Sequence, residues 1–488
     1  MSWLASCQIS KNKHMDTKQL RQKILDLAIR GKLVPQDPND EPASVLLERV
    51  KAEKERLIAE GKIKRSKKSA ASSDKPHYPF EIPSNWEWIR LDEISEIGTG
   101  ATPSTKDSSY YNNGTICWVN SSKTNCEFIT EPTTYITQKA LKETNCTIYP
   151  IGTIIMAMYG EGKTRGQISE LKISSATNQA CAAIVPLINE YKDFIKIFLK
   201  ANYWKIRTLA EGGLQPNLNL KKIASYLIPM APLAEQERIG VEVERLMSFV
   251  DEIEQSTSLM NYSLSQVKAK ILEYAISGKL VAQDPSDEPA EVLLKRVNPN
   301  AVVSTDTSHY SIPNTWIWVK LSDIFEINPK NHNNDDEDDC GFVPMSYVQD
   351  GYSGEHTFEV RKWGKVKKGY SHFQNGDIGV AKISPCFENL KSTIFHSLPN
   401  NIGAGTTELV IMRGKEIFAP FFLYLFKSPW YISKGTVYFK GVVGQQRVSR
   451  DIFTSLEVPL PPLNEQKRIS AKVDELFAVI DQIQQSLE

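Results

Sequence analysis

The sequence predicts an α/β (α+β) fold in which two similar α/β domains are separated by long antiparallel coiled-coil helices. Residues 23–50 recur as residues 270–297, at an offset of 270 − 23 = 247. Residues 232–239 recur as residues 462–469, at a different offset of 462 − 232 = 230. The stretches between these segments have similar lengths but little mutual similarity. The chain therefore alternates a repeated frame with two divergent inserts.

Length and composition limit the class of protein. The 488 residues are enough for three or four domains of roughly 150 residues each. Seven cysteines without a Cys-x-x-Cys pair, no apolar run long enough for a bilayer and no amino-terminal signal pattern indicate a cytoplasmic protein. Residues 1–14 lack the periodicity of the segment after Met15, and we assign them no function.

The charges are balanced overall but clustered locally. The 58 basic and 58 acidic residues give a formal charge of zero, which by itself argues against nucleic-acid binding. Basic runs nevertheless occur at residues 62–68 and 361–368, and an acidic run occurs at 335–339. The simplest interpretation of each run is a solvated loop.

The apolar residues after Pro232 predict a long coiled-coil helix. Their steps alternate between four and three, with Thr257 as one polar member of the seam. A helix over the 36 residues 239–274 would be roughly 54 Å long at about 1.5 Å per residue. The seam residues of this segment are Ile239, Val243, Leu246, Val250, Ile253, Met260, Leu264, Val267 and Ile271.

The second copy of this helix is divided between the two ends of the chain. Its first half is repeated by Ile469, Val473, Leu476, Ile480 and Ile483, and its second half by Leu20, Ile24 and Leu27. Bringing the two ends together would rebuild a rod beside the central one, so we predict a circularly permuted repeat with a pseudo-twofold axis. The simpler alternative is a pair of amphipathic helices, each packed on its local domain.

The same segment follows the helix in both copies of the repeat. Gly31 and Gly278 suit a helix C-cap and begin the segment Gly-Lys-Leu-Val. Gln-Asp-Pro and a short helical Glu-Pro-Ala-x-Val-Leu-Leu segment follow in each copy. Because both copies keep the same exit segment, we predict that the frame binds the same partner at two equivalent surfaces.

The inserts are predicted to be diverged copies of one α/β domain. Each begins with an I-P-x-x-W-x-W segment, at residues 82–88 and 312–318, which predicts a strand with tryptophans in the core. Both continue with a glycine-led strand, at 152–157 and 376–381, and then with a polar turn. A shared framework with altered loops is how a recognition domain changes its target.

These motifs resemble the DNA-specificity subunit of type I restriction-modification systems. The resemblance covers essentially the whole chain after Met15. It rests on the P-L-x-E-Q-x-R-I start of each helix, the G-K-L-V exits, the I-P-x-x-W-x-W segments and the run Gly-Val-Val-Gly-Gln-Gln-Arg-Val at 441–448. It implies two target-recognition domains held apart by antiparallel helices, each reading one half of an asymmetric bipartite site in double-stranded DNA.

The resemblance also implies partners and a division of the chain. Two modification (methyltransferase) subunits would dock on the helices and methylate adenine, and restriction (translocase and nuclease) subunits would join them to cleave. This chain would bind no cofactor and contact no membrane, since S-adenosylmethionine, ATP and Mg are expected on the partner subunits. The segments would be 1–75, an N-terminal helical region with a basic linker; 76–233, target-recognition domain 1; 234–300, the central coiled-coil helix and its exit; 301–461, target-recognition domain 2; and 462–488, the C-terminal helix.

We find no catalytic motif in the sequence. Residues 157–164 resemble a phosphate-binding loop, but its first glycine is replaced by Ala157 and a strand-like pattern follows in place of a helix. An amino-methyltransferase needs an Asn/Asp-Pro-Pro-aromatic motif, whereas the Pro-Pro pair here lies in Leu460–Leu463. His332 stands near the acidic run in a spacing that matches no known metal-ligand set. We therefore predict neither catalysis nor a metal site.

Polar and basic side chains in the turns of the inserts are the candidates for DNA readout. Long polar side chains reach base edges, while basic ones fix the DNA backbone. The candidates are Lys163, Arg165, Asn178, Gln179 and Gln215 in the first insert and Lys382, Lys391, Thr406, Thr407, Gln445, Gln446 and Arg447 in the second. As an alternative role, Asn178 and Gln179 would satisfy buried backbone groups. Because Gln215–Leu218 corresponds to the different sequence Gln445–Val448, the two half-sites should differ.

Two other classes of protein stay open. A free-standing restriction or modification enzyme would need catalytic motifs that we do not find. A coiled-coil adaptor without DNA readout would explain the helices but not the paired, diverged inserts. We favour a non-catalytic DNA-recognition scaffold that binds DNA weakly alone, because its net charge supplies little counterion release, and tightly once methyltransferase subunits close around the duplex.

If the helix length acts as a ruler, inserting one heptad into both rods should lengthen the gap between the two half-sites. Mapping the methylated sequence before and after the insertion checks this prediction. An unchanged recognition sequence would contradict it.

Overall fold

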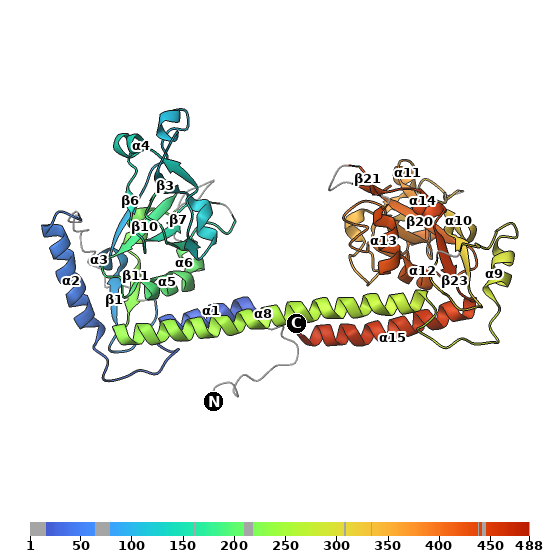
Figure 1. Ribbon diagram of the computed structural model, residues 1–488, viewed down its shortest axis with the longest axis horizontal. Helices are drawn as coiled ribbons and strands as arrows, with labels where there is room; N and C mark the ends of the chain where they lie inside the picture. The colour runs from blue at the N-terminus through green and yellow to red at the C-terminus, as the bar shows by residue number, and fades with distance from the viewer. Residues whose placement is uncertain are drawn as a thin grey trace. The chain divides into compact units, whose positions relative to one another are not determined.

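The chain forms two compact units. The computed structural model describes residues 16–63, 79–160, 162–208, 218–306, 309–332, 334–437, 439–441 and 446–487. Unit 1 is Met1–Gln255 and unit 2 is Ser256–Glu488. The boundary lies inside helix α8 (Leu233–Ile276), so this one helix contributes to both units (Figure 1). No helix within the described ranges has the length and apolar character needed to cross a membrane.

Unit 1 is built on two mixed β-sheets and a separate strand pair. The larger sheet has the strand order β2-β10-β7-β8-β4, and the smaller has the order β5-β3-β9-β6. Most neighbouring strands are antiparallel, but β3 runs parallel to β9 and β4 runs parallel to β8. The strands are β1 (Glu87–Arg90), β2 (Ser95–Thr99), β3 (Ile116–Val119), β4 (Phe128–Ile129), β5 (Thr134–Ile136), β6 (Ile148–Tyr149), β7 (Ile154–Ala157), β8 (Ile168–Leu171), β9 (Ser175–Thr177), β10 (Cys181–Pro186) and β11 (Leu227–Met230).

Unit 2 repeats this arrangement. Its sheets have the orders β13-β20-β17-β18 and β15-β14-β19-β16, and β14 runs parallel to β19 as β3 does to β9. The prediction that the inserts are diverged copies of one domain is confirmed. The strands are β12 (Ile317–Lys320), β13 (Phe325–Ile327), β14 (Asp339–Val343), β15 (Glu359–Lys362), β16 (Ser371–Phe373), β17 (Ile378–Ala381), β18 (Ser392–Ile394), β19 (Gly403–Gly405), β20 (Leu409–Gly414), β21 (Phe439–Lys440), β22 (Arg447–Val448) and β23 (Glu457–Leu460).

Helices flank the sheets and form the frame. Those of unit 1 are α1 (Thr17–Ile29), α2 (Ala43–Ala59), α3 (Leu91–Ile94), α4 (Gln138–Glu143), α5 (Lys192–Ala201), α6 (Tyr203–Thr208) and α7 (Leu220–Ala224). Those of unit 2 are α9 (Ala290–Val297), α10 (Leu321–Ile324), α11 (Trp363–Val366), α12 (Ala419–Phe426), α13 (Pro429–Val437), α14 (Asp451–Thr454) and α15 (Leu463–Leu487). The longest helix after α8 is the C-terminal α15, as the apolar periodicity predicts.

The I-P-x-x-W-x-W segments lead into strands, as predicted. In unit 1, β1 pairs antiparallel with β11, which immediately precedes α8. In unit 2, β12 pairs in the same way with β23, which precedes α15. Trp86 and Trp316 are each 3% exposed, so both belong to the core of their unit. Each strand pair therefore links the start of an insert to the start of its helix.

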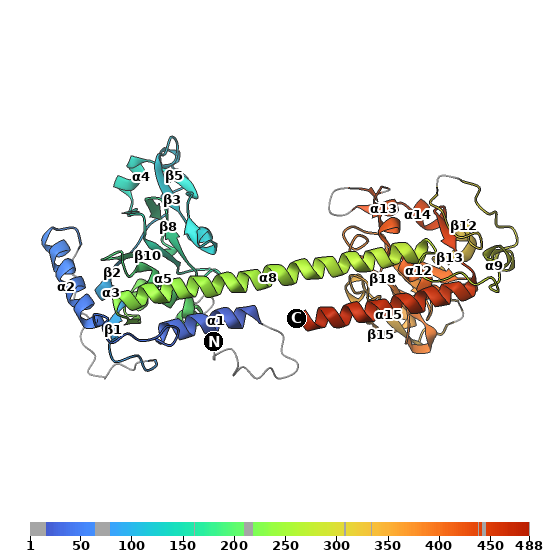
Figure 2. The same ribbon diagram turned by 60° about the horizontal axis from the view of Figure 1, so that its bottom comes forward.

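The split helix is matched by equivalent contacts in the two units. In unit 1, α1 lies beside the first half of α8, and in unit 2, α15 lies beside the second half (Figures 1 and 2). Arg21 Nη2 is 2.5 Å from the carboxylate of Asp251, and Lys268 Nζ is 2.5 Å from the carboxylate of Asp481. These are the same pair in the repeat, because 268 − 21 = 247 and 481 − 251 = 230. Both helix pairs run antiparallel.

The buried face of the helices drifts away from the predicted heptad seam. Fully buried seam residues are Ile24, Ile239, Val243, Val250, Ile469, Val473 and Ile480; half-buried ones are Leu20, Leu27, Leu246, Ile253, Leu264, Ile271 and Leu476; exposed ones are Met260, Val267 and Ile483. Beyond the middle of α8, burial resumes at Leu272, Ala275 and Ile276. In the part of α8 that belongs to unit 2, burial thus lies one residue past the predicted seam residue Ile271, at Leu272.

A buried carboxylate attaches each unit to its helix. In unit 1, Glu235 is 0% exposed and accepts hydrogen bonds from the indole Nε1 of Trp86 (2.9 Å) and from the side-chain amide of Gln36. Unit 2 repeats this arrangement with Glu465, Trp316 (2.9 Å) and Gln283. Burial raises the pKa of both carboxyl groups, and the two hydrogen bonds oppose that rise.

A bidentate ion pair completes each attachment. Arg238 donates to both carboxylate oxygens of Asp40 at 3.1 and 2.6 Å, and Arg468 donates to Asp287 at the same two distances. We call each set the helix joint: Gln36, Asp40, Trp86, Glu235 and Arg238 in unit 1, and Gln283, Asp287, Trp316, Glu465 and Arg468 in unit 2. The three repeated sequence motifs thus converge on one cluster in each unit.

Substituting the two glycines that pack against the joint residues Trp86 and Trp316 should test this packing. Gly31 (φ +65°) and Gly278 (φ +71°) lie where a Cβ would stand 2.5 Å from Cγ of Pro83 and 2.4 Å from Cγ of Pro313. We expect Gly31→Ala and Gly278→Ala each to lower the free energy of unfolding by about 2–4 kcal/mol, through backbone strain and overpacking together. Denaturant unfolding measures the loss.

Gly61→Ala is the matched control. Gly61 has φ +70° but nothing within 4 Å of an added Cβ, so this variant should lose only about 1 kcal/mol to backbone strain. Equal losses at Gly31 and Gly61 would contradict a packing role for the joint.

Candidate nucleic-acid interface

Loops from three parts of unit 2 meet at the ends of β17 and β20, the two central strands of the β13-β20-β17-β18 sheet. We call this cluster the unit 2 edge, and it consists of Lys382, Thr406, Thr407, Glu408, Gln446 and Arg447. The amide of Lys382 donates to the carbonyl of Glu408 (2.9 Å), and the amide of Val448 donates to the carbonyl of Lys382 (2.8 Å). The amide of Ser384 donates to the carbonyl of Gln446 (2.8 Å). The backbone therefore brings together five residues that the sequence predicted as DNA contacts and adds Glu408.

Unit 1 has the same backbone arrangement. The amide of Met158 donates to the carbonyl of Ala180 (2.8 Å), and the amide of Leu218 donates to the carbonyl of Met158 (3.1 Å). Asn178 and Gln179, which precede Ala180, therefore occupy the place that the two threonines occupy in unit 2. Gln215 and Gln445, also predicted as DNA contacts, lie outside the described residues.

The two edges differ in their side chains. Gln179 is exposed and accepts a hydrogen bond from the hydroxyl of Thr102 (2.7 Å). The buried Oδ1 of Asn178 has no hydrogen-bond partner in the part of the chain that the structure describes. In unit 2 the corresponding hydroxyl of Thr406 accepts from the amide of Glu408 (3.2 Å), and Thr407 is exposed. The same framework thus presents amides in one unit and hydroxyls with a carboxylate in the other.

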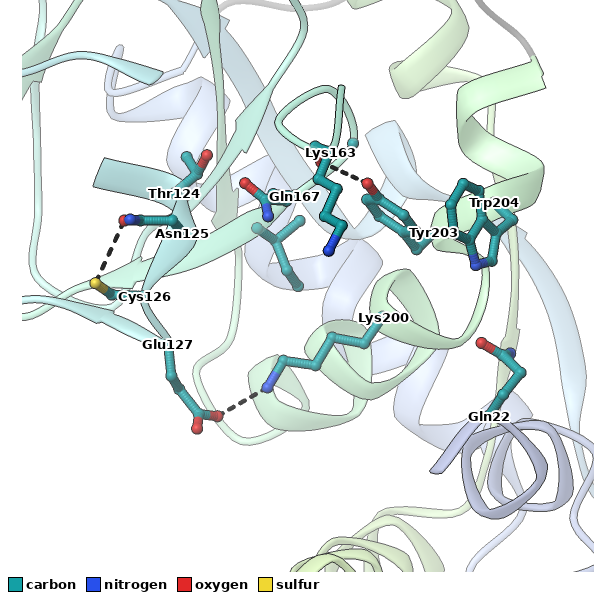
Figure 3. A pocket seen from close by; sticks show the side chains of 12 residues that line it. Gln22, Thr124, Asn125, Cys126, Glu127, Lys163, Gln167, Lys200, Tyr203 and Trp204 are labelled. Atoms are coloured by element: carbon teal, nitrogen blue, oxygen red, sulfur yellow. Dashed lines mark hydrogen bonds and ion pairs between the residues drawn. The ribbon is translucent and has the colours of Figure 1, made fainter. Parts of the chain in front are cut away.

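The turn that carries Lys163 and Arg165 is held by helix α6. Arg207 donates from Nη1 to the carbonyl of Arg165 (2.5 Å) and from Nη2 to the carbonyl of Gly162 (2.6 Å). The hydroxyl of Tyr203 donates to the carbonyl of Lys163, as Figure 3 shows. Because these contacts use backbone carbonyls, the exposed side chain of Lys163 stays available for a ligand. The following segment is strand β8, so no long helix is present to complete a phosphate-binding loop.

A pocket of about 450 Å³ lies beside this turn. In Figure 3 the side chains of Lys163 and Lys200 extend into it, and Tyr203 and Trp204 form one wall. Lys200 is paired with Glu127 at 2.8 Å, and Trp204 is 64% exposed. Because Lys200 is paired with Glu127, the pocket presents the ammonium group of Lys163 and an aromatic surface next to the turn.

Lys391 is directed into the fold. Its Nζ donates to the carbonyl oxygens of Val348 (2.7 Å) and Met345 (3.3 Å) and lies 3.5 Å from the carboxylate of Asp350. Its side chain is only 15% exposed. In this structure the ammonium group fastens a loop, which is a different role from the predicted DNA contact.

The acidic and basic runs of unit 2 pair with each other. Lys367 Nζ is 2.5 Å from the carboxylate of Asp336, and Lys362 Nζ is 3.0 Å from that of Asp339. Much of the positive charge at 361–368 is therefore neutralised locally. The sequence suggested two separate solvated loops, whereas the fold places them side by side.

A buried carboxylate also holds three lysines together in unit 1. Glu170 is 2% exposed, and its oxygens lie 2.8 Å from Nζ of Lys172, 3.0 Å from Lys192 and 2.7 Å from Lys196. Burial by itself raises the pKa of this carboxyl, but the three ammonium groups outweigh it and lower the pKa to about 2. The three lysines therefore have a structural role around Glu170, although one carboxylate offsets only one of their three charges.

One group within the described ranges has the composition of a metal site. Ligand atoms of Asp306, His309 and Glu457 lie within 4.8 Å of one another. His309 Nε2 is 2.6 Å from Glu457, and its ring stacks on Trp318 at 4.2 Å. These contacts already explain the cluster as a histidine–carboxylate pair, so we assign no metal to it.

Sequence reasoning missed Glu408 and Arg207. The residues predicted from the sequence are amides, hydroxyls and bases, and nothing in the sequence marks Glu408 as the partner of an arginine 39 residues away. Arg207 supports the turn through backbone carbonyls 42 and 45 residues earlier, and no sequence signal reveals such a contact.

Comparisons with known proteins agree with this architecture. A family model described as "Type I restriction modification DNA specificity domain" matches residues 83–259 and 313–488. The chain is 42% identical over 242 residues to the type I restriction enzyme EcoAI specificity subunit of Escherichia coli, an alignment that spans 46% of this chain and 41% of that protein. It is 24% identical over 372 residues to the EcoKI specificity subunit of Escherichia coli (strain K12), spanning 74% of this chain and 75% of that protein.

A solved structure shares the fold. One chain from a study of complex assembly and conformational transition of the type I R-M system aligns over 84% of this chain and 94% of its own length. The TM-score is 0.55 and the sequence identity is 16%.

Neutralising Glu170 should reveal how much unit 1 depends on its lysine cluster. The pKa of about 2 lies below the ordinary value of 4.5, so the ionised carboxylate stabilises the fold above pH 4.5, and this contribution is lost as the pH falls toward 2. We expect Glu170→Gln to lower the free energy of unfolding by about 2–3 kcal/mol at pH 7, with the difference shrinking between pH 4.5 and 2. Denaturant unfolding at several pH values measures it.

Glu127→Gln is the matched control, because the pair of Glu127 with Lys200 is largely exposed and should contribute under about 1 kcal/mol. A difference between wild type and Glu170→Gln that did not change with pH would contradict the electrostatic explanation.

Proposed function

The chain belongs to the type I restriction modification DNA specificity family, and from this premise we propose that it is the non-catalytic DNA-recognition subunit of a type I restriction-modification complex. Each unit reads one half of an asymmetric bipartite site in double-stranded DNA. The frame helices set the spacing of the half-sites.

The observation that carries this proposal is the pair of equivalent edges with different side chains. Asn178, Gln179 and Ala180 in unit 1 correspond to Thr406, Thr407 and Glu408 in unit 2 on the same backbone. Base pairs differ in the pattern of donors and acceptors that they present in the major groove. Two edges with different donors and acceptors therefore select two different half-sites.

The frame exposes apolar residues at equivalent positions of its two copies. Val45 and Val292 are 37% and 48% exposed, and they correspond at the offset of 247. Phe249 and Val479 are 47% and 51% exposed, and they correspond at the offset of 230. Exposed apolar positions on a repeated surface fit two copies of one partner. We assign these faces to two modification (methyltransferase) subunits, with restriction subunits joining through them.

The chemistry belongs to the partners in this proposal. S-adenosylmethionine, ATP and Mg bind to the modification and restriction subunits, and this chain holds no cofactor. Its cytoplasmic location is part of the same proposal. The described cysteines, all of them free thiols, fit a reducing compartment.

A coiled-coil adaptor without DNA readout is the less favoured alternative. It accounts for α8 and its partner helices. It gives no reason for two copies of a mixed-sheet unit whose framework is kept while the edge side chains change.

Genome-wide mapping of N6-methyladenine tests the proposal. We expect cells that express this chain with its companion methyltransferase to show a bipartite methylated motif, because the chain directs the enzyme to two half-sites. Cells that lack only this chain should lose the motif.

A second arm separates recognition from assembly. Replacing residues 313–461 with the corresponding insert of a relative should change one half of the motif and leave the other half intact. Methylation that persists without the chain, or a motif that ignores the replacement, would favour the adaptor.

A further inference from the structure

Arg447 and Glu408 form a bidentate pair at the unit 2 edge. Arg447 Nε lies 3.0 Å from both carboxylate oxygens of Glu408, and Nη2 lies 2.6 Å from Oε1. The side chains are 49% and 24% exposed, so the pair faces solvent. It occurs where three loops meet, among the residues that the proposed function assigns to DNA.

The backbone under Arg447 is fixed. Arg447 pairs with Lys440 in the β21–β22 ladder and forms a β-bridge with Ile383. Val448, which follows it, is 4% exposed and donates its amide to the carbonyl of Lys382. The Cα of Arg447 is therefore anchored to the sheet, and Glu408 restrains the side chain beyond it.

Only one side of the guanidinium is used by Glu408. Arginine has five N–H donors in a planar fork, and the contacts to Glu408 engage the side formed by Nε and Nη2. The end formed by Nη1 and Nη2 keeps two parallel N–H groups directed away from the carboxylate. Such a pair of donors matches two acceptors that lie side by side.

Stability does not explain this pair. An ion pair between exposed side chains contributes about 0–1 kcal/mol, toward the upper end when it is bidentate, because solvent screens it and ordering the side chains costs entropy. The hydrogen bonds from Arg447 lower the pKa of Glu408, so both groups stay charged near neutral pH. What the pair does achieve is to restrict the arginine to one orientation before any ligand binds.

Unit 1 lacks the pair. The position of Glu408 is occupied by Ala180, which makes the equivalent backbone hydrogen bond to Met158. The position of Arg447 corresponds to Asn217, at the offset of 230, and Asn217 lies outside the described residues. The arginine–carboxylate pair therefore occurs in unit 2 only, and it would act on one half-site only.

We propose that Arg447, positioned by Glu408, reads a guanine in the half-site recognised by unit 2. In the major groove, guanine presents O6 and N7 as two adjacent acceptors, and bidentate donation from arginine is the commonest specific contact to it. Lysine cannot reproduce the planar fork. Glu408 is a positioning residue that orients the arginine and touches no base in this arrangement. The inference rests on the proposed function and adds one specified base to it.

The test is selection from a randomised double-stranded DNA library by the full chain assembled with its companion modification subunits. The wild-type complex should enrich a bipartite motif with a guanine in the unit 2 half-site. Arg447→Lys and Arg447→Ala should lose the preference for guanine at that one position by about 5- to 150-fold and keep every other position of both half-sites. Thermal unfolding of each variant should match wild type, since the side chain is half exposed.

Glu408→Gln separates positioning from charge. Removing a negative charge near phosphates should keep or raise overall affinity for DNA, while the looser arginine discriminates guanine several-fold less well. A merely structural residue would change affinity and discrimination together. Lys440→Ala is the matched control, because Lys440 is an exposed base on the neighbouring strand. This variant should weaken binding to all sequences equally and leave the preference for guanine at that position unchanged.

The outcomes are distinct. An unchanged guanine preference in Arg447→Ala overturns the inference while the bipartite motif keeps the proposed function intact. Uniform weakening on all DNA, as expected for Lys440→Ala, also overturns it by making Arg447 a phosphate contact. A wild-type complex that enriches no bipartite motif means that the proposed function itself has failed.

Discussion

A buried carboxylate at the start of a helix is the interaction on which each unit depends. Glu235 and Glu465 are almost fully buried, and a buried charge is tolerable only when its oxygens are hydrogen-bonded. The donors come from two different segments, the residue just before the first strand of the insert and the loop that follows the frame helix. One side chain therefore ties together three segments that are far apart in sequence. Its exact duplication is what gives both units the same attachment to the helices.

Many of the described charged side chains are paired with each other within the fold. Glu170 holds three lysines, and the acidic run near Asp336 holds the basic run near Lys367. Within the described residues, acidic and basic side chains are thus paired locally at these two places. With a formal net charge of zero, the sequence offers little long-range attraction for phosphates.

The repeats made the fold predictable, whereas the contacts at the edges were only partly so. Two offsets identified two equivalent units, and the motifs at those offsets proved to be the parts of one joint. Of the seam residues, Ile239 and Ile469 are buried whereas Met260, Val267 and Ile483 are exposed, because a residue pattern does not record where a helix is covered by the rest of its unit. Lys391 was predicted to be a surface base, and no role was predicted for Glu408. Both roles depend on contacts between loops that are far apart in sequence, and the sequence does not reveal such contacts.

The edges are fastened to the sheets through main-chain hydrogen bonds, such as those that link Lys382 to Glu408 and Met158 to Ala180. Because these hydrogen bonds use main-chain atoms, they do not depend on which side chains the edge carries. Under the proposed function, a substitution there would alter one half of the recognised sequence while the other half is inherited unchanged. New specificities would then arise by small steps, with the helix joints left untouched.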